Sequence, residues 1–211
     1  KSLIVIGGGI NGVAIALDAV QLGYEVTLIE KSTVGSGTSS KTSKLAHGGL
    51  RYLQQFQFKV VRESVQERNR LLETYPDFVH PLKFVVPVYN SSPWGMLTLS
   101  LGLTVYDFFS GFGSPLPWHR RLSVEEITEG YPDLVSRDLK GGFSYYDAQM
   151  DDLGLVRHMA DEARQRGVCV LENHQCIGLE YHHGHVCGVR IRHDHMERVL
   201  LADQVIQTAG P

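Results

Sequence analysis

Three glycines near the start of the chain have the spacing of a nucleotide-binding turn. The sequence GGGING, residues 7–12, places Gly7, Gly9 and Gly12 in a G-x-G-x-x-G register. In such a turn the first glycine permits a tight bend, the second lets the backbone approach a pyrophosphate, and the third lets the following helix pack closely on the strand. The N-terminus of that helix presents free N–H groups and a partial positive charge to the phosphate.

The residues around these glycines predict a β-α-β unit. Residues 3–6 are a short apolar run typical of a buried parallel strand, residues 10–22 have apolar side chains at helical spacing, and residues 25–30 form a second strand. Glu30 ends that second strand, 18 residues after Gly12. This separation is close to the roughly 20 residues at which a carboxylate accepts the ribose hydroxyls of a bound dinucleotide. The pattern therefore predicts that a dinucleotide is bound.

A polar segment, SSKTSKLAHGGLRYLQ, follows at residues 39–54. Its first six residues are four hydroxyl side chains and two lysines, and it has neither the alternation of a half-buried strand nor the apolar stripe of a helix. Because it comes soon after Glu30, we expect it to run along the extended dinucleotide. The hydroxyl groups expected to donate to pyrophosphate and ribityl oxygens are those of Ser39, Ser40, Thr42 and Ser43. Gly48 and Gly49 would let the backbone lie against a flat ring, since neither carries a Cβ.

Together with YDAQMDDLGLV at residues 146–156, these segments resemble the FAD-dependent, aerobic-type glycerol-3-phosphate dehydrogenases of the D-amino-acid-oxidase-like flavoprotein superfamily. The run HGGLRYL, residues 47–53, is the specific part, because amino-acid oxidases of the superfamily share the glycine pattern but typically lack this heptapeptide. The resemblance covers essentially all 211 residues and corresponds to somewhat under half of a family member. We therefore expect an N-terminal fragment.

The resemblance implies an α/β fold in which a Rossmann-like FAD-binding domain is interrupted by a mixed α+β substrate domain. The FAD-binding domain would contain a parallel sheet and an antiparallel β-meander. The expected boundaries are residues 1–78 for its first part, residues 79–150 for part of the substrate-binding domain, and residues 151–211 for its second, truncated part.

The resemblance also implies roles for individual residues. Those that would hold the ADP half of FAD are Gly7, Gly9, Gly12 and Glu30. Those that would line the pyrophosphate and flavin are Thr38, Ser39, Ser43, Lys44 and Leu45. Those that would face the substrate as catalytic residues are His47, Arg51 and Tyr52.

Two of these roles have a physical basis of their own. Arg51 suits a phosphate-bearing substrate because its planar fork can bind two phosphate oxygens at once. His47 could accept the proton of the substrate hydroxyl, orient the ring, or be a buried histidine without chemistry, and the sequence leaves all three open. The chain departs from the family's common D-D-x-R-L pattern, because DDLGL has Gly154 at the position of the arginine. This departure weakens any role that the family's arginine would have at this position.

The activity implied by the resemblance is oxidation of sn-glycerol 3-phosphate to dihydroxyacetone phosphate by hydride transfer to FAD, with electrons passed to a quinone. The implied location is cytoplasmic, peripheral on the cytoplasmic face of the inner membrane, and the expected partners include a second copy of the chain in a homo-oligomer. Two alternatives stay open. One is another oxidase of the superfamily, with the carboxylate of an amino acid or a 2-hydroxy acid opposite Arg51, and the other is an inactive FAD-binding fragment.

The rest of the chain has a mixed pattern. Expected helices are residues 52–75, a short helix after a capping box of Ser123 and Glu126, and a helix capped by Asp151 or Asp152 that runs to residue 165. Expected strands are residues 84–88 and 141–146, an antiparallel meander after residue 168, and a strand at residues 205–208. Residues 93–109 are apolar but shorter than the about 20 residues of a membrane span, so an interfacial helix or a core helix is expected.

Composition excludes other classes of protein. A net charge of −3 provides no basic surface for nucleic acid. Three cysteines without C-x-x-C spacing favour a reducing compartment over a disulfide framework. Capping explains the acidic pair Asp151 and Asp152 near Asp147. No metal site is expected from the histidines that crowd two turns, because none has ligand spacing: His182, His183, His185, His193 and His195.

Overall fold

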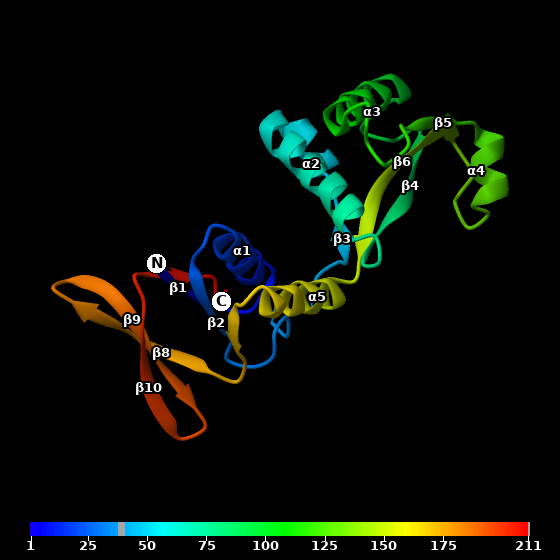
Figure 1. The fold of residues 1–211 in the computed structure, drawn as a ribbon. Helices are drawn as coiled ribbons and strands as arrows, with labels where there is room; N and C mark the ends of the chain where they lie inside the picture. Colours follow the sequence, from blue (N-terminus) through cyan, green and yellow to red (C-terminus); the bar gives the residue numbers. More distant parts are fainter. Residues whose placement is uncertain (38–40, 211) are drawn as a thin grey trace. The chain divides into compact units, whose positions relative to one another are not determined.

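The computed structural model describes residues 1–37 and 41–210, and its contacts divide the chain into two compact units (Figure 1). The first unit joins Lys1–Ser43 to Asp151–Pro211, and the second is Lys44–Met150. Residues 44–78, expected with the nucleotide-binding part, pack instead with residues 79–150. The reason is local, because this segment supplies a strand and a helix to the sheet and core of the second unit.

The first unit is built on a parallel sheet with the strand order β11-β1-β2-β7. Its strands are β1 (Ser2–Ile6), β2 (Glu25–Ile29), β7 (Cys169–Leu171) and β11 (Gln204–Gln207). β1 pairs in parallel with both β2 and β11, so the first strand of the chain lies in the middle of the sheet. The expected β-α-β unit is confirmed, and the final strand forms within one residue of its expected position.

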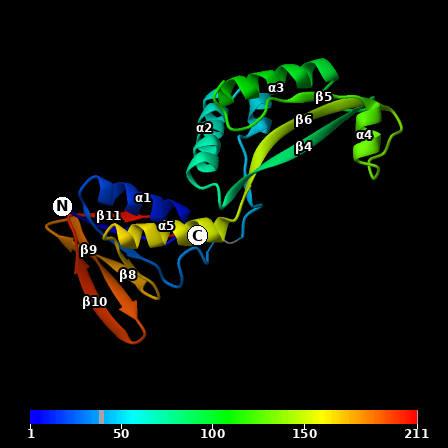
Figure 2. The same ribbon diagram turned by 45° about the vertical axis from the view of Figure 1, so that its right-hand side comes forward.

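Two layers cover this sheet (Figures 1 and 2). Helices α1 (Ile10–Gln21) and α5 (Asp152–Gln165) pack on each other and contact the parallel strands. The meander consists of β8 (Gln175–His182), β9 (His185–His193) and β10 (Met196–Leu201). Alternate side chains of a strand point to opposite faces, and Ile4 and Ile6 of β1 pack with Val189 and Ile191 of β9. The expected antiparallel meander is therefore confirmed from Gln175 onward, and it packs on the parallel sheet through β9. The expectation was wrong for β7, which pairs in parallel with β2 instead of joining the meander.

The second unit has an antiparallel sheet in the order β3-β6-β4, with β5 also paired to β6. Its strands are β3 (Leu45–Ala46), β4 (Val79–Tyr89), β5 (Arg120–Leu122) and β6 (Leu139–Met150). Its helices are η2 (Leu50–Gln55), α2 (Phe58–Thr74), α3 (Met96–Ser110) and α4 (Val124–Gly130). The expected capping box at the start of α4 is present: the Ser123 side chain accepts from the N–H of Glu126, whose carboxylate accepts from the N–H of Ser123.

The expected continuous helix over residues 52–75 is wrong. A 3₁₀ helix ends at Gln55, Phe56 adopts a left-handed conformation with φ of 55°, and α2 begins at Phe58. Leu50 and Leu53 are three residues apart, which suits the 3₁₀ repeat, and both pack on the core cluster formed by α2 and α3. The contacts of these two partly buried leucines therefore favour a separate short helix before α2.

The expected strand at residues 84–88 is too short, because β4 runs from Val79 to Tyr89 and includes Pro81 and Pro87. Among the strands of residues 1–37 and 41–210, β4 pairs only with β6, so it lies at an edge of this sheet. Proline is tolerated at an edge because the missing N–H is not needed by a second neighbour. The strand expected at residues 141–146 likewise extends to residues 139–150, where β6 pairs with three others.

We expect Val189→Ala to lower the free energy of unfolding of the full-length protein by about 2 kcal/mol, since it removes two buried methyl groups and leaves a cavity. Urea denaturation would measure the loss. Val199→Ala is the matched control, because Val199 of β10 is 48 % exposed and its truncation should cost less than about 0.5 kcal/mol. Equal losses for both valines would contradict the packing of β9 on the parallel sheet.

Candidate functional site

The glycine turn after β1 forms where its spacing predicts it. Gly7 has φ of +107°, and a Cβ there would lie 2.8 Å from the backbone of Thr208 and Ala209. A Cβ on Gly12 would lie 1.9 Å from the carbonyl oxygen of Gly7. Gly9 is the extended residue that precedes α1, and its carbonyl accepts the N–H of Val13. At Gly7 and Gly12 the backbone approaches its neighbours so closely that no other residue fits.

Glu30 lies beside this turn at the carboxyl end of β2. One carboxylate oxygen accepts from the N–H of Gly8 at 2.7 Å, and the other accepts from the N–H of Ser32 at 2.9 Å. These bonds hold the carboxylate against the glycine turn. The oxygen bonded to Ser32 N–H also accepts from the Ser32 hydroxyl at 3.3 Å, whereas the oxygen bonded to Gly8 has a further lone pair for a ligand hydroxyl.

A cleft of about 220 Å³ opens at the carboxyl ends of β1 and β2. This is the edge at which open parallel sheets bind their ligands. Its walls are formed by the ends of β1 and β2, by the residues that precede and begin β8, and by one residue after β11. They are Ile6, Gly7, Ile29, Glu30, Lys31, His174, Gln175, Cys176 and Ala209. Gly7 and Glu30 thus line one cavity, as a dinucleotide site requires.

Three of these lining residues were not anticipated from the sequence: His174, Gln175 and Cys176. They follow β7, which pairs in parallel with β2, so its carboxyl end lies at the same edge of the sheet. Recognition of β7 as a parallel strand would have indicated them. The N–H of His174 also donates to the carbonyl of Glu30 at 2.9 Å, which ties this segment to the end of β2.

The polar segment contributes to both units. The predicted roles of Thr38 and Ser39, and that of Ser40, lie outside the described residues. Ser43 is exposed at the end of the first unit's leading segment. Lys44 and Leu45 begin the second unit, where the Lys44 carbonyl accepts the N–H of Met150 at 2.9 Å.

His47 lies on the turn between β3 and η2 of the second unit, and Arg51 and Tyr52 lie in η2. The side chain of His47 is exposed. The guanidinium of Arg51 donates to the Tyr52 hydroxyl at 3.1 Å and lies 5.0 Å from the Tyr52 ring centroid. Arg51 is exposed and Tyr52 is partly buried, so the guanidinium rests on the tyrosine and has further donors for an anion.

Gly48 and Gly49 are required by the packing of the second unit itself. A Cβ on Gly48 would lie 2.1 Å from the Tyr106 hydroxyl and 2.3 Å from the side chain of Val65. Gly49 has φ of +74° and caps η2. The close approach that we expected toward a flat ring is thus explained at Gly48 by a neighbouring tyrosine and valine.

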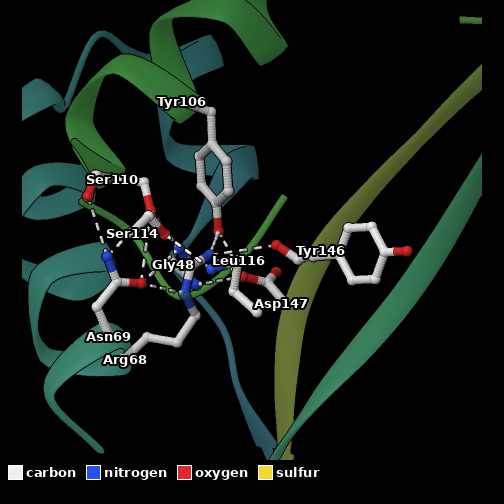
Figure 3. Close-up of polar contacts among 9 residues, drawn as sticks. All are labelled: Gly48, Arg68, Asn69, Tyr106, Ser110, Ser114, Leu116, Tyr146 and Asp147. Carbon is white, nitrogen blue, oxygen red and sulfur yellow. Dashed lines mark hydrogen bonds and ion pairs between the residues drawn. The ribbon is translucent and has the colours of Figure 1, made fainter. Parts of the chain in front are cut away.

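A buried ion pair lies directly behind this turn (Figure 3). Arg68 of α2 donates to Asp147 of β6 at 2.7 Å, and both side chains are almost fully buried. The Tyr106 hydroxyl donates to the same Asp147 oxygen at 2.6 Å. Burial raises the pKa of Tyr106, and the Asp147 charge adds to the increase, so the phenol stays protonated and acts as a donor. Sequence reasoning missed this role of Asp147.

The neighbouring acids have separate functions. Asp151 caps α5 by accepting from the N–H of Gly154 at 3.1 Å, so the expected cap is confirmed. Asp152 is 6 % exposed and accepts from the Thr42 hydroxyl, which connects the start of α5 to the polar segment. Its Oδ1 is buried and has no hydrogen-bond partner among the described residues, so this oxygen favours an additional donor.

Within residues 1–37 and 41–210, no group of three or more His, Cys, Asp or Glu side chains is arranged to hold a metal ion. His174 and His193 stack at 4.4 Å between ring centroids.

In the part of the chain that the structure describes, no helix combines the length and the apolar character needed to cross a membrane.

The sheet order, the glycine turn and the acidic strand end define a dinucleotide-binding α/β protein. The chain belongs to the FAD dependent oxidoreductase family, whose sequence model matches residues 2–211. It is similar to a glycerol-3-phosphate dehydrogenase of Synechocystis sp., with 46 % identity over 84 % of this chain and 32 % of the relative. It is also 36 % identical to a D-erythritol 1-phosphate dehydrogenase of Brucella abortus over 99 % of this chain and 41 % of that protein.

The fold agrees with the structure of a glycerol-3-phosphate dehydrogenase from Bacillus halodurans complexed with FAD. The TM-score is 0.74 at 27 % identity, and the match covers 100 % of this chain and 34 % of that chain. The α/β fold expected from the sequence is thereby confirmed. The chain spans between about a third and two fifths of the length of these relatives.

Replacing Gly12 with alanine should leave the purified full-length protein with little bound flavin. The added Cβ would lie 1.9 Å from the Gly7 carbonyl and would displace the start of α1. The ratio of flavin absorbance to protein absorbance measures the effect. Gly178→Ala, in the same unit, adds a Cβ with nothing within 4 Å and should keep its flavin. A Gly12→Ala protein with full flavin would contradict the role of this close approach.

Glu30→Gln should raise the Kd for FAD by about 10- to 100-fold, as expected when hydrogen bonds to a charged acceptor are lost. The amide group also places donor hydrogens beside the N–H groups of Gly8 or Ser32. Titration of the full-length apoprotein with FAD, followed by flavin fluorescence, gives the Kd. Glu25→Gln, at the exposed start of the same strand, serves as the control and should leave the Kd unchanged. Equal Kd values for the two variants would refute the assignment.

Proposed function

We propose that the complete protein oxidises sn-glycerol 3-phosphate to dihydroxyacetone phosphate with FAD as its cofactor. The observation that carries this proposal is the exposed Arg51 guanidinium bonded to Tyr52, in a chain that belongs to an FAD-dependent family and is 46 % identical to a glycerol-3-phosphate dehydrogenase. A phosphate-bearing substrate suits an arginine whose fork can bind two oxygens.

The first unit would hold the ADP half of FAD. The N-terminus of α1 is suited to the pyrophosphate, since it follows the glycine turn directly and carries the positive end of the helix dipole. Glu30 would accept the ribose hydroxyls at the cleft of about 220 Å³. The remaining predicted flavin-side residues are Thr38, Ser39, Ser43, Lys44 and Leu45. The buried, unpartnered Oδ1 of Asp152 also suits a ligand hydroxyl, since it is an acceptor that needs a donor.

The second unit would bind and orient the substrate. Bound FAD supplies a ring that accepts a hydride from the substrate carbon. Arg51 would bind the substrate phosphate, and the Tyr52 hydroxyl would orient the guanidinium through its 3.1 Å hydrogen bond. His47 would hold the proton that leaves the substrate hydroxyl at an imidazole nitrogen, since the side chain is exposed on the same turn.

We further propose a peripheral association with the cytoplasmic face of a membrane, where electrons pass to a quinone. The support is an apolar stripe on α3, where Leu97 is 86 % exposed and Leu101 and Phe108 are also exposed. Their spacing of four and seven residues places them on one helix face. Phe112, also 86 % exposed, lies two residues beyond the end of α3. Leu103 and Tyr106 on the opposite face are buried, so the core character suggested for residues 93–109 is present, and the stripe supports the interfacial one.

A homo-oligomer would cover the same stripe with a second copy. The two partners are distinguished by cosedimentation of the full-length protein with liposomes and by its mass in solution. Replacement of Leu101 and Phe108 by serine should abolish whichever association occurs.

Under anaerobic conditions, sn-glycerol 3-phosphate should bleach the yellow flavin absorbance of the full-length holoprotein. Glycerol, which lacks the phosphate, should not. Arg51→Lys keeps the charge but loses the fork, and it should raise the KM for glycerol 3-phosphate by about tenfold or more.

The alternatives give different outcomes. Bleaching by D-erythritol 1-phosphate in preference to glycerol 3-phosphate would assign the longer polyol phosphate as substrate. Bleaching by a D-amino acid or a 2-hydroxy acid, with hydrogen peroxide as the product in air, would replace the proposal with an oxidase that binds a carboxylate.

A further inference from the structure

Asp147 concentrates three donors on a single carboxylate oxygen. Its Oδ1 accepts from Arg68 at 2.7 Å, from the Tyr106 hydroxyl at 2.6 Å and from the backbone N–H of Gly48 at 3.0 Å (Figure 3). The donors come from α2, from α3 and from the turn after β3, respectively. One buried atom of β6 therefore connects the two helices to the residue that follows His47.

The arginine that pairs with Asp147 is itself held from several directions. Arg68 donates to the carbonyl of Tyr146 at 3.3 Å, to Asn69 at 2.9 Å and to the Ser110 hydroxyl at 2.7 Å. With its donors distributed over α2, α3 and β6, the guanidinium has one orientation. Its positive charge pairs with the buried Asp147 carboxylate, whose Oδ1 also accepts the Gly48 N–H.

Stability alone does not explain this arrangement. Well-packed apolar residues of similar volume often stabilise a fold as much as a buried ion pair does. The ion pair differs from apolar packing because its hydrogen bonds are directional. A carboxylate fixed by two strong donors holds the third donor, the Gly48 N–H, in one position. Gly48 has no Cβ, and one would collide with the same Tyr106 hydroxyl. The turn that carries His47 and leads to Arg51 is thus held by a hydrogen bond to Asp147 and by close contact with Tyr106.

We propose that Asp147 is a positioning residue: through the Gly48 N–H it fixes the turn that presents His47 and Arg51 to the substrate, with Arg68 and Tyr106 fixing Asp147. This proposal rests on the proposed function for its catalytic consequence, and on the geometry of the second unit for its structural part.

The test compares Asp147→Asn with Asp107→Asn in the full-length holoprotein. Asp107 is a matched control, since it is also a buried carboxylate of the second unit, 7 % exposed against 3 % for Asp147. Its bonds go to the ring nitrogen and the N–H of His119, at 2.6 and 2.9 Å, and not to the turn. In Asp147→Asn the uncharged amide must face Arg68, so the Gly48 N–H loses its charged acceptor.

Two readouts are measured for each variant. Hydrogen–deuterium exchange of a peptide covering residues 45–52 should accelerate by about tenfold in Asp147→Asn and remain at the wild-type rate in Asp107→Asn. The rate constant of anaerobic flavin reduction by sn-glycerol 3-phosphate should fall by about tenfold in Asp147→Asn only, with the Kd for FAD unchanged.

Each other outcome decides against the proposal or against the proposed function. Equal exchange rates in the two variants would overturn the structural part, and faster exchange with an unaltered reduction rate would overturn the catalytic part. If the wild-type flavin is not reduced by glycerol 3-phosphate, the proposed function fails, and the exchange comparison still decides whether Asp147 holds the turn.

Discussion

Close approach of neighbouring groups to the backbone at two glycines is the constraint on which the candidate site depends. At Gly12 the start of α1 lies against the carbonyl of Gly7, which brings the N-terminus of the helix to the end of β1. At Gly48 the turn after β3 lies against Tyr106 and Val65. In both places the missing side chain lets a polar backbone group reach the position where it is needed. The helices and sheets of each unit set the direction of these approaches.

Local patterns in the sequence were sufficient for much of the first unit and for two helix starts. The period of the apolar residues and the glycine spacing predict β1, α1 and β2, and alternation with turns predicts the meander. Asp151 as a helix cap and the capping box at Ser123 follow from three-residue spacings. These features are decided by residues close together in the chain, and local sequence reasoning therefore finds them.

Features that depend on distant partners were missed. Asp147 looks like an isolated acid beside two capping acids, because its partner Arg68 is 79 residues away. His174 joins the cleft because β7 adds to the far side of β2, and three residues are too few for periodicity to predict such a strand. The break at Phe56 accompanies the packing of Leu50 and Leu53 on the core cluster of α2 and α3, a contact that helical spacing alone does not predict.

The discontinuity of the first unit has a consequence for how the chain acquires its structure. β1 lies between β2 and β11. The residues that pair between β1 and β11 are about two hundred positions apart in the sequence, as in Leu3 with Gln204. The ribosome releases the N-terminal strands first, and one side of β1 stays unpaired until β11 has been made. The intervening segment, Lys44–Met150, can form its own sheet in the meantime. Pairing over so large a separation is slow, so newly made protein exposes the apolar edge of β1 for longer than most strands, and chaperone dependence during synthesis would follow.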